Sequence, residues 1–276
     1  MKKNPLGTLT PADTDATCCG GDSSLEIIHT HLDSITVAVQ HHYGTFAERA
    51  AKDTSNVRAA DHFYTDDQRS VLTDEAAAAS AGCGNPIGVA DAKAGETVLD
   101  LGSGGGIDCF LAAREVGSTG HVIGIDMTPR MLELARSNAE KLRTDNVVFK
   151  LGQIESIPQQ DRSVDLVISN CVIALSQQKD RVFSEVFRIL KPGGRFVISD
   201  VVTDEPLPEG VQKSAKEWVG CVAGAAVMTD YLALVHETGF TDLEILGKRK
   251  KKDDTEEWRS SLINLTLRAF KPVLER

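Results

Sequence analysis

The stretch DLGSGGGID, residues 100 to 108, joins a short apolar run to an amphipathic segment and decides the fold of this chain. The run TVLDLG ends in Gly102, and GGIDCFLAAREVG follows with the apolar spacing of a helix. Glycines at 102, 104 and 106 allow a sharp turn and the close approach of a ligand to the backbone. Free N–H groups at the start of the next helix favour an anionic or polar ligand. The stretch therefore predicts a strand, a ligand-binding turn and a helix.

Working outward, apolar runs alternate with amphipathic segments from about residue 97 to residue 202. The further expected strands are HVIGID, VVFKLG, VDLVISN and RFVISDVV. Between them, TPRMLELARSNAEKL begins with Thr128 as a plausible N-cap and Pro129 at the first helical position. QKDRVFSEVFRIL is a second amphipathic helix, stopped by Pro192-Gly193-Gly194. This alternation predicts an α/β fold with a parallel, Rossmann-like sheet covered on both faces.

The flanking segments differ in pattern. Residues 1–24 are polar, Leu25 to Ala51 keeps roughly helical spacing, and TDEAAAASA, residues 73–81, begins as a capped helix does. After Pro206, EGVQKSAKEWVGCVAGA predicts a helix, TDYLALVHETG a second one closed by Gly239, and the last two apolar runs a pair of strands. We expect a helical N-terminal extension, a central sheet domain and a small α+β cap, with ranges 1–78, 79–205 and 206–276.

Composition excludes several classes of function. The 276 residues carry a formal net charge of -10, which argues against a nucleic-acid partner. The basic run at residues 248–252 is followed closely by acidic residues, as in a solvated hairpin tip. No run reaches the ~18 apolar residues of a membrane span, and the N-terminus has no secretory h-region. We therefore expect a cytoplasmic monomer without membrane contacts.

Six cysteines stand in the chain, and no pair has C-x-x-C spacing, so a zinc ribbon or a thioredoxin-type motif has little support. In a reducing compartment these residues are expected to be free thiols that serve packing, metal binding or catalysis. They are Cys18, Cys19, Cys83, Cys109, Cys171 and Cys221. Cys109 lies among apolar residues of the first predicted helix, and we expect it in the core.

The form of the glycine turn indicates its ligand. A dinucleotide fingerprint, G-x-G-x-x-G, would place glycine at 107, where Ile107 stands. The G-x-G-x-G form instead resembles motif I of the S-adenosylmethionine-dependent methyltransferases. Asp126 ends the second strand, where a carboxylate accepts hydrogen bonds from both ribose hydroxyls. A glycine turn with a helix-capping aspartate is the alternative interpretation.

The other candidate cofactor residues lie at the same edge of the predicted sheet. Asp100 sits beneath the glycine turn, either fixing its N–H groups or holding the methionine amine, and it could instead be structural. Met127 is expected against the adenine, and the segment after the third strand is expected at the adenine amino group. The full expected set is Asp100, Gly102, Ser103, Gly104, Gly106, Asp126, Met127, Ile154, Glu155 and Asn170.

Three cysteines occupy positions that could converge. Cys83 lies in AGCGNP before the first strand, Cys171 lies in SNCVIAL at the end of the fourth, and Cys221 lies in WVGCVAGA in the expected cap. Small neighbours leave room for a ligand, and thiolates suit soft centres. The residues alone leave packing open as the alternative for each cysteine, because free Cys is among the most buried residue types.

The motifs SAGCGNP, ETVLDLGSGGGIDCFLAA, VIGIDMTP, SNCVI, LKPGG, SDVV and GCVAGA, in this order, resemble the arsenite methyltransferase family over about residues 70 to 245. The resemblance implies a class I methyltransferase fold and S-adenosylmethionine as methyl donor. It also implies that Cys83, Cys171 and Cys221 bind trivalent arsenic, as arsenite or a methylated arsenical. Glutathione or thioredoxin is implied as the thiol reductant.

The chain departs from the family pattern at two places, and these departures leave the number of methyl transfers open. Members commonly carry a Cys pair after an HYG-type segment, whereas the segment after His42-Tyr43-Gly44 has none, and Cys18 and Cys19 precede it. This pair could act as a relay or as a disulfide partner for Cys83, or be incidental. Ala174 stands where the family usually shows Asn, which could shift preference toward methylated arsenicals.

Two other functions remain open from the sequence. An enzyme of the same fold could methylate carbon or oxygen of a small apolar molecule, such as a quinone precursor. Alternatively, the chain could be a thiolate metal- or metalloid-binding module with a vestigial nucleotide cleft. No Asn/Asp-Pro-Pro-aromatic motif follows the fourth strand, which disfavours methylation of base amino groups.

Overall fold

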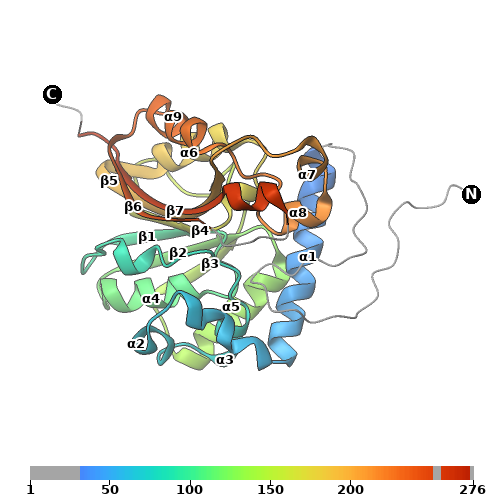
Figure 1. The fold of residues 1–276 in the computed structure, drawn as a ribbon. Helices are drawn as coiled ribbons and strands as arrows, with labels where there is room; N and C mark the ends of the chain where they lie inside the picture. Colours follow the sequence, from blue (N-terminus) through green and yellow to red (C-terminus); the bar gives the residue numbers. More distant parts are fainter. Residues whose placement is uncertain (1–31, 251–255, 274–276) are drawn as a thin grey trace, which may run out of the picture.

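The computed structural model describes residues 32–250 and 256–273, which form one mixed sheet with helices on both faces (Figure 1). The sheet has seven strands in the order β3-β2-β1-β4-β5-β7-β6. The first five strands in this order are parallel to one another, and β7 runs antiparallel to both of its neighbours, β5 and β6. The strands are β1 Thr97–Leu101, β2 His121–Asp126, β3 Val147–Leu151, β4 Val164–Asn170, β5 Leu190–Thr203, β6 Thr241–Lys250 and β7 Leu262–Phe270.

Helices cover the sheet as the alternation of segments predicts. Figure 1 shows α4 and α5 on one face of the sheet, and α6 and α9 on the other. Short 3₁₀ turns lie at Ser55–His62, Ile87–Val89, Ile173–Leu175 and Glu257–Ser261. The α-helices are α1 Leu32–Lys52, α2 Asp66–Arg69, α3 Asp74–Ala78, α4 Ile107–Val116, α5 Pro129–Leu142, α6 Lys179–Ile189, α7 Glu209–Gln212, α8 Ala215–Val219 and α9 Met228–Glu237.

Apolar side chains of the central strands point alternately into two cores. Val98 and Leu166 pack with Phe110 of α4, whereas Leu99 and Val167 pack with Phe183 of α6. Because both faces are buried, these strands carry near-continuous apolar runs instead of alternating polar residues. The expected α/β sheet is confirmed.

The C-terminal region continues this sheet. β6 and β7 form the expected antiparallel hairpin, and β7 pairs with β5 along its whole length. Helix α8 lies beside α1, which also contacts α5 and α3, and α7 packs against α8 (Figure 1). The covering elements near the carboxyl ends of the parallel strands are therefore α1, α7 and α8.

One expected helix divides into two. EGVQKSAKEWVGCVAGA forms α7, then α8, and Cys221 lies in the loop that follows. The Ser214 side chain accepts a hydrogen bond from the Glu217 N–H at 3.3 Å, so Ser214 acts as the N-cap of a new helix. The prediction of a continuous helix through Cys221 was wrong, because Ser214 interrupts it. At Thr73 a cap of the same kind begins α3, as expected.

Two glycines of the decisive stretch provide a matched pair for a stability test. Gly102 has φ 65°, and a Cβ there would lie 2.5 Å from a Val172 methyl, whereas Gly104 has φ 51° and nothing within 4 Å. Gly104→Ala should cost about 1–2 kcal/mol for the left-handed backbone alone. Gly102→Ala should cost about 2–5 kcal/mol, because it adds overpacking to the same backbone term. Urea unfolding of both variants without ligand measures the difference, and equal costs would contradict the contact with Val172.

Candidate active site

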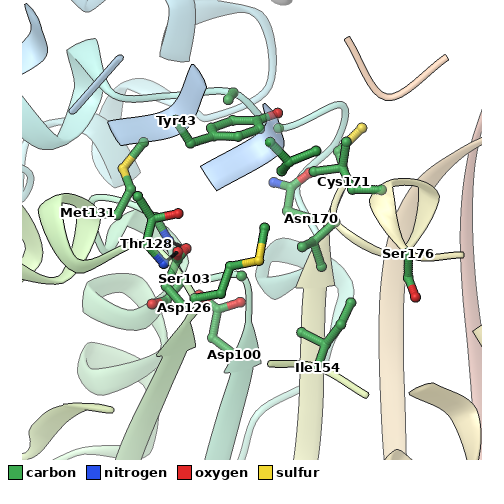
Figure 2. Close-up of a pocket in the computed structure, with 18 of the residues that line it drawn as sticks. Tyr43, Asp100, Ser103, Asp126, Thr128, Met131, Ile154, Asn170, Cys171 and Ser176 are labelled. Atoms are coloured by element: carbon green, nitrogen blue, oxygen red, sulfur yellow. Dashed lines mark hydrogen bonds between the residues drawn. The ribbon is translucent and has the colours of Figure 1, made fainter. Parts of the chain in front are cut away.

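A cavity lies at the carboxyl ends of the parallel strands (Figure 2). Asp100, Ser103 and Asp126 lie on one side of it and Asn170 and Cys171 on the other, with Tyr43 across the top (Figure 2). Most of the sequence-predicted cofactor residues line this cavity. They are Asp100, Gly102, Ser103, Gly104, Asp126, Met127, Ile154, Glu155 and Asn170. Gly106 is not among the lining residues. It is the N-cap of α4 and has φ 96°.

The glycine turn and the end of β2 are joined through Asp126. Its Oδ2 accepts a hydrogen bond from the Gly104 N–H at 3.0 Å, and its Oδ1 accepts one from the Thr128 N–H at 2.8 Å. Burial raises the pKa of Asp126, and these two backbone N–H groups oppose that rise. The carboxylate is thus oriented before any ligand arrives, with lone pairs left for hydroxyl donors in the cavity.

Two more buried carboxyl groups lie under the turn. Asp100 accepts a hydrogen bond from the Cys109 thiol at 3.3 Å, and burial together with the charge of Asp108 raises the pKa of Asp100. Asp108 accepts a hydrogen bond from the Tyr64 hydroxyl at 3.0 Å, and burial raises the pKa of Asp108 to about 6. Cys109 is fully buried in the core formed by α4, which confirms the prediction for it.

Two buried polar atoms of the cavity are without a protein partner. Asp108 Oδ1 and Ser103 Oγ make no hydrogen bond within the described part of the chain, and both residues line the cavity. Unpartnered buried polar groups are costly, so a site of this kind fits a ligand with polar groups of its own. A ligand with a cationic ammonium and hydroxyl groups suits these acids, as S-adenosylmethionine does.

The three cysteines Cys83, Cys171 and Cys221, here called the thiol cluster, meet beside this cavity. Cys83 and Cys221 both lie close enough to the Cys171 thiol to shift its pKa. Cys221 Sγ also donates a hydrogen bond to the Cys171 carbonyl oxygen at 3.1 Å. All three residues are buried in one small apolar group, and Cys171 additionally lines the cavity. The convergence that the sequence left open is therefore present.

The backbone at two of these cysteines is unusual. Cys171 has φ 63° and Cys221 has φ 59°, a left-handed conformation that few residues other than glycine adopt. The Cys171 N–H donates to the Ser199 carbonyl at 2.7 Å, which anchors the turn to β5. Strained residues of this kind persist where the surroundings fix them, and they gather at functional sites.

The thiol of Cys171 has a raised pKa. The Cys221 thiol lowers the pKa of Cys171, but the hydrogen bond with Cys83, burial, and the charges of Cys83 and Asp200 raise it further, and the net pKa lies well above its usual value. In residues 32–250 and 256–273, no group of three or more His, Cys, Asp or Glu side chains is arranged to hold a metal ion. The thiols are thus neighbours, and their use as a joint ligand set remains a proposal.

Similarity to known proteins agrees with this site. A family model described as a methyltransferase domain matches residues 92–260. An arsenite methyltransferase of Halobacterium salinarum is 48% identical over 198 residues, which are 70% of this chain and 51% of that protein. The crystal structure of an arsenic(III) S-adenosylmethionine methyltransferase from Chlamydomonas reinhardtii has a TM-score of 0.64 and 37% identity, covering 80% of this chain and 75% of that one. The chain belongs to the arsenite methyltransferase family.

The mouse arsenite methyltransferase is 40% identical over 152 residues, 52% of this chain and 40% of that protein. The present chain spans about half of the length of the curated relatives that it matches. Cys18 and Cys19 lie outside the described residues, as do Leu25 and Ile28 of the expected N-terminal helix. No helix in the described ranges is long and apolar enough to cross a membrane.

Sequence reasoning missed three residues that line this cavity. Tyr43 of α1 lines the cavity, and its hydroxyl lies 3.7 Å from Cys221 Sγ and donates to the Val219 carbonyl at 3.3 Å. Tyr64 and Asp108 form the hydrogen-bonded pair under the turn. Asp108 had a local signal, because it is an acid at the start of the helix after a glycine turn. Tyr43 and Tyr64 had none, because their partners are far away in the sequence.

A buried polar group also lies behind the thiol cluster. Asp200 of β5 is fully buried and accepts a hydrogen bond from the Tyr231 hydroxyl at 3.1 Å. Burial raises the pKa of Asp200 to about 6, although the charge of Lys179 opposes this rise. Burial lowers the pKa of Lys179 to about 8. Burial thus shifts the pKa of Asp200 and the pKa of Lys179 toward neutral pH from opposite sides.

Proposed function

We propose that this protein transfers the methyl group of S-adenosylmethionine to trivalent arsenic held by Cys83, Cys171 and Cys221. One observation carries the proposal: Cys171 belongs to the thiol cluster and also lines the cavity that contains the cofactor-type acids. A soft centre held by these sulfurs would therefore lie next to the bound cofactor.

The residues of the cavity divide the work of binding. Asp126 accepts hydrogen bonds from the ribose hydroxyls, and Met127, Ile154 and Glu155 surround the adenine. The buried acids beneath the glycine turn face the cationic methionine end. S-adenosylmethionine supplies a methyl group that its sulfonium already activates. The chain therefore needs to align and desolvate the reacting atoms, which is worth up to ~7–11 kcal/mol of the barrier.

The thiol cluster positions the nucleophile. Arsenite exchanges its oxygen ligands for the three cysteine sulfurs, and each exchange releases water because the thiol proton joins the departing hydroxide. The arsenic lone pair then forms a bond to the methyl carbon as the bond from carbon to the sulfonium sulfur breaks. No proton leaves the nucleophile, so no general base is required. The arsenic is formally oxidised in this step, and glutathione or thioredoxin supplies the electrons that return it to the trivalent state.

The direct test is mass spectrometry of arsenic species after incubation of the protein with arsenite, glutathione and S-adenosylmethionine. We expect methylated arsenicals together with an equivalent amount of S-adenosylhomocysteine. Absence of both products, with arsenite bound, would favour a thiolate binding module instead. Turnover of a quinone-type acceptor by a variant without the thiol cluster would favour a small-molecule C- or O-methyltransferase.

A further inference from the structure

The side chain of Asn170 connects two separate parts of the candidate site. Asn170 is the last residue of β4, directly before Cys171. Its Oδ1 accepts hydrogen bonds from the Cys83 N–H at 3.0 Å and from the Gly84 N–H at 3.2 Å. Its Nδ2 donates to the Gly84 carbonyl at 2.9 Å. One amide group thus binds three backbone groups of the Cys83–Gly84 segment, two N–H groups and one carbonyl.

The remaining capacity of this amide is also used within the protein. Nδ2 lies 3.1 Å from the Tyr64 hydroxyl and 3.1 Å from Asp108 Oδ2. An amide has two donor hydrogens and one acceptor oxygen with two lone pairs, so these contacts saturate it. Although Asn170 lines the cavity, it has no free polar atom for the cofactor that the sequence assigned to it.

The loop around Cys83 is shaped to accept this contact. A Cβ at Gly82 would lie 2.4 Å from Asn170 Nδ2, and a Cβ at Gly84 would lie 2.5 Å from Ser199 Oγ. Both glycines are therefore required for the loop to lie directly on the ends of β4 and β5. On its other side, the Cys83 carbonyl accepts a hydrogen bond from Asn264 at 3.1 Å. The loop has no helix or strand pairing of its own and is held by side chains.

We infer that Asn170 is a positioning residue that sets the Cys83 thiol beside Cys171. Without its amide, the Cys83 and Gly84 N–H groups lose this acceptor, while the Asn264 contact with the Cys83 carbonyl is kept. Cys171 remains anchored to Ser199 by its own N–H, so the spacing between the two sulfurs is what changes. The placement follows from the contacts alone, whereas its consequence for arsenic binding rests on the proposed function.

The placement is tested with dibromobimane, which becomes fluorescent when it bridges two neighbouring thiols. The background variant carries Cys18→Ser, Cys19→Ser and Cys221→Ser, so that Cys83 and Cys171 are the reactive pair. Adding Asn170→Ala should slow bridging of this pair by about tenfold or more, because a shift of about 1 Å is enough for such a loss. Peptide mapping identifies the bridged residues.

Two further variants make the comparison decisive. Asn146→Ala is the matched control, because Asn146 donates to the backbone carbonyls of Ala113 and Gly117 at the opposite end of the sheet. The rate at which Cys83 and Cys171 are bridged should be unchanged in this variant. Asn170→Asp keeps the oxygen that accepts from Cys83 and Gly84, and it should keep more bridging than Asn170→Ala. Equal bridging in Asn170→Ala and the background would overturn the inference.

The consequence for binding is tested by a double-mutant cycle with arsenite as the probe and Trp fluorescence as the signal. Asn170→Ala should weaken arsenite binding about tenfold when Cys83 is present, and by less than about twofold in a Cys83→Ala background. Equal losses in both backgrounds would show a general structural role and contradict the inference. If the wild type binds no arsenite, the proposed function fails, and the bridging experiment still decides the placement.

Discussion

Cys171→Ser should reduce arsenite methylation by about 10³-fold or more, which corresponds to about 4 kcal/mol of transition-state stabilisation. Cys171 lines the cavity and belongs to the same buried group as Cys83 and Cys221. A serine hydroxyl is a hard ligand that binds soft centres poorly, and it leaves arsenic without the sulfur closest to the methyl donor. Loss of alignment at this position removes most of the proximity contribution.

The substitution is conservative for the fold. Serine is close in size to cysteine and keeps the N–H that donates to Ser199. We therefore expect S-adenosylmethionine affinity, measured by calorimetry, to remain within about threefold, or less than 1 kcal/mol. A loss of methylation with retained cofactor binding assigns the defect to the nucleophile.

Cys109→Ser is the matched control for arsenite binding. Cys109 is equally buried, but it lies in α4 and donates to Asp100 instead of contacting the thiol cluster. Arsenite affinity should therefore be unchanged in Cys109→Ser and strongly reduced in Cys171→Ser. If Cys171→Ser methylates arsenite at the wild-type rate, Cys171 is not a ligand to arsenic and the thiol cluster is not the arsenic site.

The helices and strands, and the candidate cofactor residues at the strand ends, were predictable because each is indicated by residues that are neighbours in the sequence. Gly102, Gly104 and Asp126 follow directly from strand ends, and parallel strands bring such ends to one edge of the sheet. The cysteines were predictable as candidates, but the residues alone left their meeting open, because Cys83 and Cys221 lie in loops whose paths depend on distant partners. The resemblance, not the pattern, selected the three.

The contacts that fix these loops could not be predicted. Asn170 reaches Cys83 across 87 residues of sequence, and Tyr43 reaches Cys221 across 178. The residues next to an asparagine in the sequence do not distinguish one that hydrogen-bonds a distant loop from one that faces a ligand. The split of the helix before Cys221 did have a local signal at Ser214, but the apolar residues on either side of it were compatible with one continuous helix.

The structure shows the surroundings of Ala174, the residue that stands where the family usually shows Asn. The residue is fully buried in the apolar group that contains the thiol cluster. Its carbonyl would lie 2.0 Å from a Cβ at Gly224, so the segment after Cys221 packs directly on it. The small side chain therefore lies where the loops of Cys171 and Cys221 meet, which is where a change in arsenical preference would have to act.

Asp126→Ala should weaken S-adenosylmethionine binding by about 100-fold or more, equivalent to roughly 2.7 kcal/mol. Each hydrogen bond from a ribose hydroxyl to a buried carboxylate contributes about 1.5–3 kcal/mol, and Asp126 is placed to accept two. Alanine also removes the acceptor of the Gly104 N–H, so the glycine turn loses its connection to the end of β2. Both losses act on the same ligand and reduce its affinity.

The control for this prediction is Asp165→Ala. Asp165 lies at the opposite end of the sheet, where it accepts from the Thr97 N–H and pairs with Lys191. Its removal should lower stability without changing cofactor affinity, which separates loss of a strand-end acid from loss of a ligand contact. Calorimetric titration with S-adenosylhomocysteine reads binding without turnover. An unchanged affinity in Asp126→Ala would show that the ribose lies elsewhere, and the orientation of the cofactor with its methyl toward Cys171 would then have no support.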